Sequence, residues 1–282
     1  MHQALILAVW FAAAATGEAA AEPGGLDRAM TRLYNYDFAG AHALLDEELR
    51  ARPNDPVIYA VRGAAYLFAE FERQHILELQ FFEDDADLTD HKRLRADPEA
   101  RERLFRTTGE ARTLAEARLV VRPDDRDALF ALCTAASTEA DYTGLIEKRY
   151  FRTYQLSKES QRYARRLLAL EPPVWDAQLT IGTAEYVVGS LNFFFRLFVR
   201  FDQIEGSKQK AVADLEIVAT RGRYYRPFAK VLLAAVHLRE NRPAQALALL
   251  KELDSEFPGN PLVKREIVRA EEKMRAGFSA RR

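Results

Sequence analysis

The sequence predicts an all-α fold built from helical hairpins, in which each hairpin is a pair of packed helices. Apolar residues recur at three- and four-residue steps, as Ala41, Leu44, Leu45 and Leu49 do, and the segment stops at Pro53. Other segments begin with a proline, which suits the first helical turn because its missing N–H has no partner there. These two signals divide the chain into successive helices.

The predicted helices pair into five hairpins followed by one further helix. The second hairpin is expected to begin with a helix of about twice the usual length, and a polar surface loop follows that helix. In chain order the predicted segments are residues 26–36 and 39–50, then 56–82 and 98–122, then 124–140 and 155–171 with a connector at 141–154, then 174–188 and 207–222, then segments around 233–237 and 246–257, and finally 262–274.

Three small residues are predicted to mark close approaches between paired helices. Gly63 lies inside a helix, where glycine costs roughly 1 kcal/mol relative to alanine, so it indicates that another helix packs tightly there. Cys133 and Gly182 take the same place in the third and fourth hairpins. Cys133 is the only cysteine, so no intramolecular disulfide can form and a buried, unreactive thiol is expected.

These features resemble the tetratricopeptide (TPR) repeat, which carries an aromatic residue, a glycine and a tyrosine in one helix and an alanine and a proline in its partner. The matching residues are Tyr59, Gly63, Tyr66, Ala41 and Pro53. The resemblance implies a right-handed TPR-like solenoid of about five hairpins plus a C-terminal capping helix. It also implies that the first helices of the hairpins line a concave groove that receives a peptide.

Insertions near residues 67–100 and 189–206 interrupt this TPR-like domain. Together with the segment GRYYRPFAKVLLA they are more loosely similar to a divergent TPR family whose eukaryotic members are associated with clearing inclusion bodies at mitochondria. That role is not carried over, because the chain begins like a bacterial export signal.

The N-terminal segment predicts export from the cytoplasm. Residues 4–15 form an apolar run that is too short to span a bilayer, and small residues at 19–21 precede Glu22. We therefore expect a signal peptide at residues 1–21, a mature domain at 22–282, and a periplasmic or secreted protein. An uncleaved anchor is the alternative, because the first three residues contain no Lys or Arg.

Charge and motifs exclude little but favour a non-enzymatic protein. Forty-one basic and forty-two acidic residues give no field that would gather nucleic acid. No HExxH, CxxC, phosphate-binding loop or GxSxG motif occurs, so no cofactor, metal or catalytic residue is predicted. The acidic segment 83–91 could supply cation ligands, but it lacks the calcium-loop pattern and is expected to be a solvated loop. An enzyme or metal-binding protein that uses this loop is kept as an alternative.

The expected function is a protein–protein interaction scaffold. By spacing, the groove lining is apolar to mildly polar and lacks a basic clamp for a terminal carboxylate, so a hydrophobic or extended segment of a protein is the predicted partner. A competing interpretation is that the insertions bury several of these positions. The predicted partner-binding residues are Phe68, Phe130, Thr134, Leu179, Thr183, Tyr186 and Arg239.

Residues 191–201 read LNFFFRLFVRF, which is apolar nearly all round. The segment is expected to seal a gap between hairpins. The alternative is a surface helix that meets a partner or, peripherally, a membrane, as in a membrane-associated envelope assembly factor. Its contacts would be Phe194, Arg196, Phe198 and Arg200.

Overall fold

The computed structural model describes residues 24–78, 94–190 and 206–279, and these ranges contain helices and no strand. A π-helical turn, η1 (Tyr142–Ile146), follows α7, and a 3-10 turn, η2 (Trp175–Ala177), precedes α9. The α-helices are α1 (Gly25–Tyr34), α2 (Phe38–Ala51), α3 (Pro56–Arg73), α6 (Pro98–Val121), α7 (Arg126–Asp141), α8 (Tyr150–Leu168), α9 (Gln178–Ser190), α11 (Lys208–Arg221), α12 (Arg226–Arg239), α13 (Pro243–Glu256) and α14 (Pro261–Ser279).

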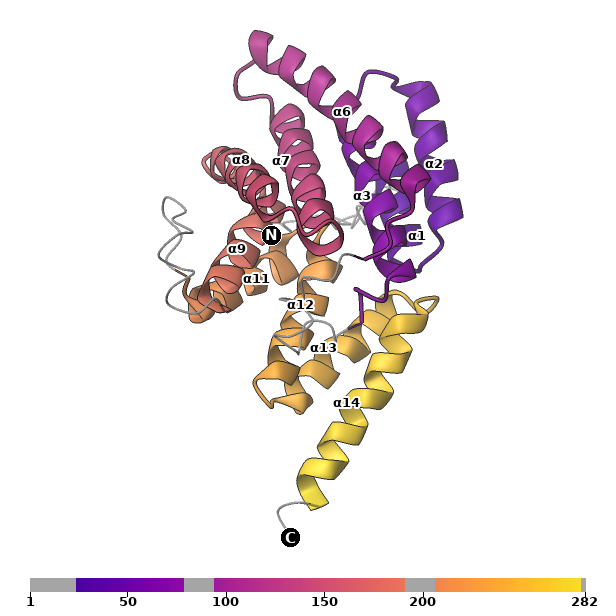
Figure 1. Ribbon diagram of the computed structural model, residues 1–282, viewed down its shortest axis with the longest axis vertical. Helices are drawn as coiled ribbons and strands as arrows, with labels where there is room; N and C mark the ends of the chain where they lie inside the picture. Colours follow the sequence, from indigo (N-terminus) through magenta and orange to yellow (C-terminus); the bar gives the residue numbers. More distant parts are fainter. Residues whose placement is uncertain (1–23, 79–93, 191–205, 280–282) are drawn as a thin grey trace, which may run out of the picture.

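The helices pack with their neighbours in the chain (Figure 1). Five pairs are in contact along their lengths: α1 with α2, α3 with α6, α7 with α8, α9 with α11, and α12 with α13. Each pair also contacts the next one, and α14 packs on α13. The predicted all-α fold of paired helices is therefore confirmed.

Aspartates begin several of these helices. The side chain of Asp55 accepts the backbone N–H of Val57 at 3.0 Å, and Asp125 accepts that of Ala128 at 3.0 Å. Asp97 does the same for Glu99 at the start of α6. Each such cap satisfies an N–H that has no partner in the helix and contributes about 1 kcal/mol.

Two predicted boundaries are wrong. The first helix of the second hairpin does not continue to residue 82, because α3 ends at Arg73 and His75 takes a left-handed backbone conformation with φ of 59°. The apolar residues Ile76 and Leu77 are buried in a turn rather than in a helix. The predicted connector 141–154 is also shorter, because the π-helical turn extends α7 and α8 begins at Tyr150.

The three predicted small-residue contacts all lie between the two helices of one hairpin. A Cβ atom on Gly63 would lie 2.7 Å from the Thr108 methyl group, and one on Gly182 would lie 3.0 Å from the Asp214 Cβ. The Cys133 Sγ lies 3.5 Å from the Ser160 carbonyl oxygen. The prediction of close approach is confirmed, and burial raises the pKa of the Cys133 thiol to about 12, which makes it unreactive.

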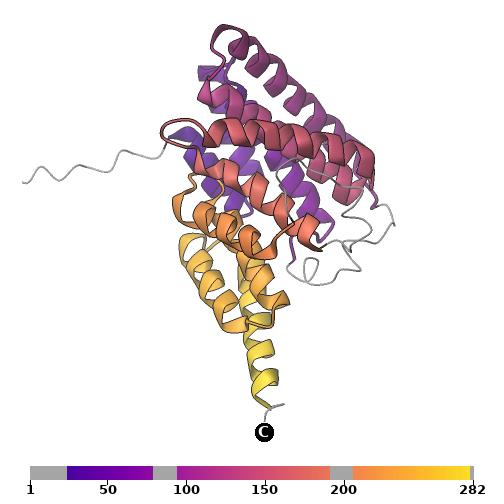
Figure 2. The same ribbon diagram turned by 90° about the vertical axis from the view of Figure 1, so that its left-hand side faces the viewer.

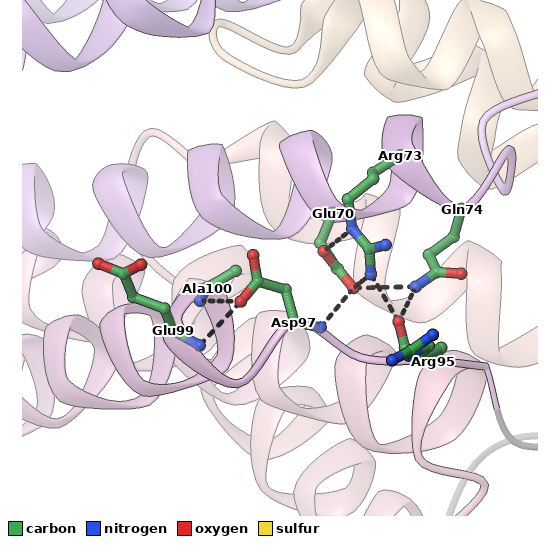
Figure 3. Close-up of polar contacts among 7 residues, drawn as sticks. All are labelled: Glu70, Arg73, Gln74, Arg95, Asp97, Glu99 and Ala100. Atoms are coloured by element: carbon green, nitrogen blue, oxygen red, sulfur yellow. Dashed lines mark hydrogen bonds and ion pairs between the residues drawn. The ribbon is translucent and has the colours of Figure 1, made fainter.

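A buried glutamate holds the long connection between α3 and α6 at its base (Figure 3). Arg73 donates to both oxygens of Glu70, and Gln74 donates to one of them at 3.1 Å. The backbone N–H of Asp97 donates to the same carboxylate at 3.3 Å. Arg73 and Gln74 also donate to the Arg95 carbonyl oxygen, so the returning chain is fixed to the end of α3.

A second buried glutamate, Glu185 of α9, fixes the chain where it returns to the start of α11. Glu185 accepts the backbone N–H of Gly206 at 2.7 Å and that of Ser207 at 3.1 Å. The Lys210 Nζ lies 2.8 Å from its other oxygen. Each long connection therefore re-enters the helical array at a fixed point.

The last hairpin returns to the first one. The Tyr34 ring lies 5.3 Å from that of Phe257, and the Gly259 N–H donates to the Asn35 side chain at 2.8 Å. Asn260 donates to the Tyr34 carbonyl oxygen at 2.8 Å. Figure 1 shows α14 starting beside α1 and extending away from the other helices, so the array closes on itself before its final helix.

Candidate interaction surface

The junction segment, residues 222–228, connects α11 to α12 and includes the first residues of α12, and one buried carboxylate fixes it. Asp176 of η2 accepts the backbone N–H groups of Arg223 at 2.9 Å, Tyr224 at 2.8 Å and Tyr225 at 2.7 Å. Only 5% of Asp176 is exposed. Three N–H groups donate to this one carboxylate, so the hydrogen bonds to Asp176 fix the backbone conformation of the junction segment.

The aromatic side chains of the junction segment cover part of the predicted groove lining. The Phe130 ring lies 5.5 Å from that of Tyr224 and 6.0 Å from that of Tyr225. The hydroxyl groups of Thr134 and Tyr225 are 3.0 Å apart. Phe130 and Thr134 are both buried. In the structure these two predicted partner-binding residues make contacts within the chain, and we call them, with the junction segment, the filled half of the inner face, which here means the face predicted to line the groove.

The first hairpin supports the filled half from the other side. The Tyr34 hydroxyl donates to the Tyr224 carbonyl oxygen at 2.8 Å, and the Arg223 guanidinium donates to both oxygens of Asp27. Burial raises the pKa values of Tyr34 and Tyr225, and it raises the pKa of Tyr224 to about 12. The junction segment is therefore bound by α1, α7 and η2 together.

Phe68 lies at the edge of the filled half. Its ring meets the Phe228 ring edge-on, with the centroids 5.3 Å apart, and both side chains are half-buried. Such aromatic pairs contribute about 0.5–1.5 kcal/mol beyond the area that they bury. Phe68 thus bridges α3 to the start of α12.

Three further predicted residues, Thr183, Tyr186 and Arg239, form a second group, which we call the open half of the inner face because part of each of them is exposed. All three are half-buried. Two cations lie near the Tyr186 ring, with the Arg239 Cζ 5.9 Å and the Lys208 Nζ 6.0 Å from its centroid. The structure thus brings α9, α11 and α12 together around one tyrosine.

Leu179 belongs to neither half. It packs with Leu215 and Val218 in the apolar cluster between α9, α11 and α12, and its carbonyl oxygen accepts the Thr183 hydroxyl at 2.8 Å. Its apolar character is therefore explained by hairpin packing.

The remaining predicted sites lie outside the described residues. They are the signal peptide at 1–21, the acidic loop 83–91, and the contacts Phe194, Arg196, Phe198 and Arg200 of the Phe-rich segment. Within residues 24–78, 94–190 and 206–279, no group of three or more His, Cys, Asp or Glu side chains is placed to hold a metal ion. The same ranges contain no helix with the length and apolar character needed to cross a bilayer.

Sequence reasoning missed the residues that organise the filled half, which are Asp176, Tyr224 and Tyr225. A signal was present, because two adjacent tyrosines precede Pro227 at the start of a helix. Aromatic residues just outside a helix N-terminus can also pack beyond their own hairpin, as both tyrosines do on Phe130 of α7. Periodicity along one helix does not show where.

Comparison with protein families, with curated proteins and with solved structures finds no match to this chain. The class of protein is accordingly defined by the fold alone: an all-α protein of consecutively packed helical hairpins, in the residues that the structure describes.

Proposed function

We propose that this protein is a TPR-like interaction scaffold, a right-handed solenoid of five hairpins and a capping helix. The observation that carries the proposal is the repetition of one contact: Gly63, Cys133 and Gly182 each meet the second helix of their own hairpin. The packing of α3 on both α6 and α7 also supports it, because TPR first helices contact their partner and the next first helix.

The partner surface in this proposal is the open half of the inner face. Tyr186 offers an amphipathic ring, and Lys208 and Arg239 set positive charge beside it. A hydrophobic or extended protein segment that carries a carboxylate near its apolar side chains would match both features. Phe130 and Thr134 are left out of the surface, because the junction segment covers them.

The proposal includes export and leaves out catalysis. The N-terminal segment favours cleavage before Glu22 and a periplasmic or secreted scaffold. No catalytic residue or cofactor is assigned. N-terminal sequencing of the protein from native cells checks the export step, and an intact Met1 in a cytosolic fraction would contradict it.

Site-specific photo-crosslinking tests the partner surface. A photoreactive amino acid replaces Thr183 of the open half in one variant and Glu116, an exposed residue of α6, in a matched control. Illumination of living cells should give a discrete protein adduct from position 183 that is absent from position 116. Both variants must melt with the parent for the comparison to count.

Two results would contradict the scaffold proposal. The first is the same adducts in equal amounts from both positions, which would indicate random encounters. The second is an adduct at 116 with none at 183, which would move the partner to another face of the protein.

A further inference from the structure

Helix α8 and the residues next to it concentrate positive charge in a chain that is nearly neutral overall. Residues 148–170 contain seven basic residues and one acidic residue, while the whole chain has a net charge of −1. The basic residues are Lys148, Arg149, Arg152, Lys158, Arg162, Arg165 and Arg166. This segment is therefore a local cationic feature that the total composition conceals.

The single acid of this segment does not neutralise it. Glu159 lies 2.7 Å from the Arg112 guanidinium of α6, which also pairs with Glu139 of α7. Glu139 and Arg112 are mostly buried. The Glu159 carboxylate is thus used to tie α8 to the neighbouring helices.

The two sides of α8 differ sharply. Leu156, Ala164 and Leu167 are buried against the array. On the opposite side, exposed residues follow at steps of four, three and four, so they form one stripe of a helix: Phe151, Gln155, Lys158 and Arg162. We call these four residues, with Arg152, the α8 stripe. In Figure 1 α8 lies at the left of the molecule, and in Figure 2 its outer side faces the reader.

The cations of the α8 stripe keep their charge available to solvent. In the part of the chain that the structure describes, none of Arg152, Lys158 and Arg162 forms an ion pair. The Lys158 ammonium lies 5.7 Å from the Tyr154 ring, and the Arg162 guanidinium lies 4.9 Å from the Tyr163 ring. These contacts hold the side chains along the helix without neutralising them.

Phe151 gives the stripe an apolar end. It is 76% exposed, the highest value among the exposed aromatic residues of the described ranges. An aromatic ring in water costs free energy unless another apolar phase takes it up. The ring therefore adds a hydrophobic requirement to the electrostatic one.

We propose that the α8 stripe docks on an anionic lipid bilayer surface. Phosphate-bearing headgroups match the three cations, and the acyl boundary below them accepts the Phe151 ring. From Phe151 to Arg162 the stripe runs about 16 Å along one side of the helix, and Arg152 lies at the edge of that side, about 100° round the helix from Phe151. Nucleic acid or an acidic protein would satisfy the cations but leaves the ring at the end of the stripe without an apolar phase. This surface is separate from the open half of the inner face and does not depend on the proposed scaffold function.

Vesicle co-sedimentation of the purified protein tests the proposal. Two kinds of vesicle are the probes. Neutral vesicles contain phosphatidylcholine alone, and anionic vesicles contain phosphatidylcholine with phosphatidylglycerol at a mole fraction of about 0.3. We expect binding to the anionic vesicles that weakens as salt is raised, and far weaker binding to the neutral ones. Apolar segments elsewhere in the chain would bind both kinds of vesicle.

Two variants on α8 separate charge from the aromatic ring. Lys158→Glu combined with Arg162→Glu should lower binding to anionic vesicles by more than about tenfold, because each cation near the surface contributes about fivefold. Phe151→Ser should lower it by about tenfold. The matched controls lie on α14: Lys264→Glu with Arg265→Glu for charge, and Val268→Ser, where Val268 is 53% exposed, for the apolar contact.

The outcomes divide cleanly once melting shows that every variant is folded. The proposal is supported if the α8 variants lose binding to anionic vesicles while both α14 controls retain it. Equal binding to both kinds of vesicle, no vesicle binding by the parent, an equal loss in the α14 controls, or unchanged binding in the α8 variants would each overturn it. Binding to an anionic polymer such as heparin without vesicle binding would overturn it as well and indicate a polyanionic partner.

Discussion

The filled and open halves of the inner face contain similar residues but differ in burial and in their neighbours. In the filled half, Phe130 and Thr134 contact Tyr224 and Tyr225 of the same chain and are buried. In the open half, Tyr186 is half-buried beside cations of α11 and α12. A groove predicted by helical spacing is therefore divided by a segment that comes from much later in the sequence.

This difference teaches that a predicted position on the lining of a helical-hairpin array does not by itself make a residue a binding residue. The junction segment is held by Asp176 and by α1, so it belongs to the core rather than to a displaceable loop. Substitutions in the filled half should therefore reduce stability, while those in the open half should reduce binding. The predictions below test that division.

The largest effect is expected for Phe130→Ala. The side chain is buried against two tyrosine rings, and truncating a buried phenylalanine costs about 3–5 kcal/mol through lost burial and the cavity left behind. Urea unfolding measures the change. Phe151→Ala, at an exposed position, serves as the control and should change stability by no more than about 0.5 kcal/mol. An equally small loss of stability in both variants would show that the Phe130 side chain is not packed in the filled half.

Asp176→Ala should lower the free energy of unfolding slightly less than Phe130→Ala does, by about 3 kcal/mol. The change leaves three backbone N–H groups of the junction segment without their acceptor, and each buried donor that loses a charged partner costs about 1–3 kcal/mol before water enters to relieve part of it. Unfolding free energy measures this effect. Asp124→Ala, on an exposed turn, is the control. A parent-like value for Asp176→Ala would mean that the junction segment is held by other contacts.

The next largest effect is expected from alkaline pH, which should lower the free energy of unfolding through the tyrosines in and around the filled half. Burial raises the pKa values of Tyr34, Tyr224 and Tyr225 above the value of about 10 in the unfolded chain. Because the folded values are the higher ones, their contribution to stability is complete below about pH 10 and is lost as pH rises through the folded values. Unfolding free energies between about pH 9 and 11 should fall in the parent and fall less in Tyr225→Phe. Parallel curves for the two proteins would contradict this.

The smallest effect on stability is expected for Tyr186→Ala, below about 1 kcal/mol, because the residue is partly exposed and its ring contacts with Lys208 and Arg239 are each weak. Partner recovery should fall while the melting temperature stays close to the parent value. Thermal melting and quantitative affinity capture of the same preparations measure the two effects. A large drop in melting temperature would place Tyr186 in the core with Phe130.

Much of the local structure follows from the sequence. Gly63 and Gly182 predict close helix contacts because glycine inside a helix is costly unless something needs the space, and both contacts are present. Pro56 and Pro98 predict helix starts for the same kind of local reason. The end of α3 was missed because Ile76 and Leu77 are apolar and buried, and burial in a turn leaves the same apolar signal as burial in a helix.

The candidate site was less predictable, because its arrangement depends on contacts between distant parts of the chain. Helical spacing placed Phe130 on the first helix of a hairpin but could not show that Tyr224, almost a hundred residues later, would cover it. The same holds for Asn35 in the first hairpin and Gly259 just after the last one, which meet although they lie far apart in the sequence. Tertiary closure of this kind has no local signature.

An engineered disulfide between the first and last hairpins tests the closure of the array most directly. A Cβ atom at position 259 would lie 3.3 Å from that of Asn35, close to the 3.5–4.5 Å that disulfides span. In a Cys133→Ala background, Asn35→Cys with Gly259→Cys should form one intramolecular disulfide on mild oxidation of dilute protein, seen as faster migration on non-reducing gels and a mass loss of about two hydrogens. Either single-cysteine variant should remain reduced and monomeric. Free thiols that persist in the double variant, or bonds that form only between molecules, would show that the last hairpin does not return to the first.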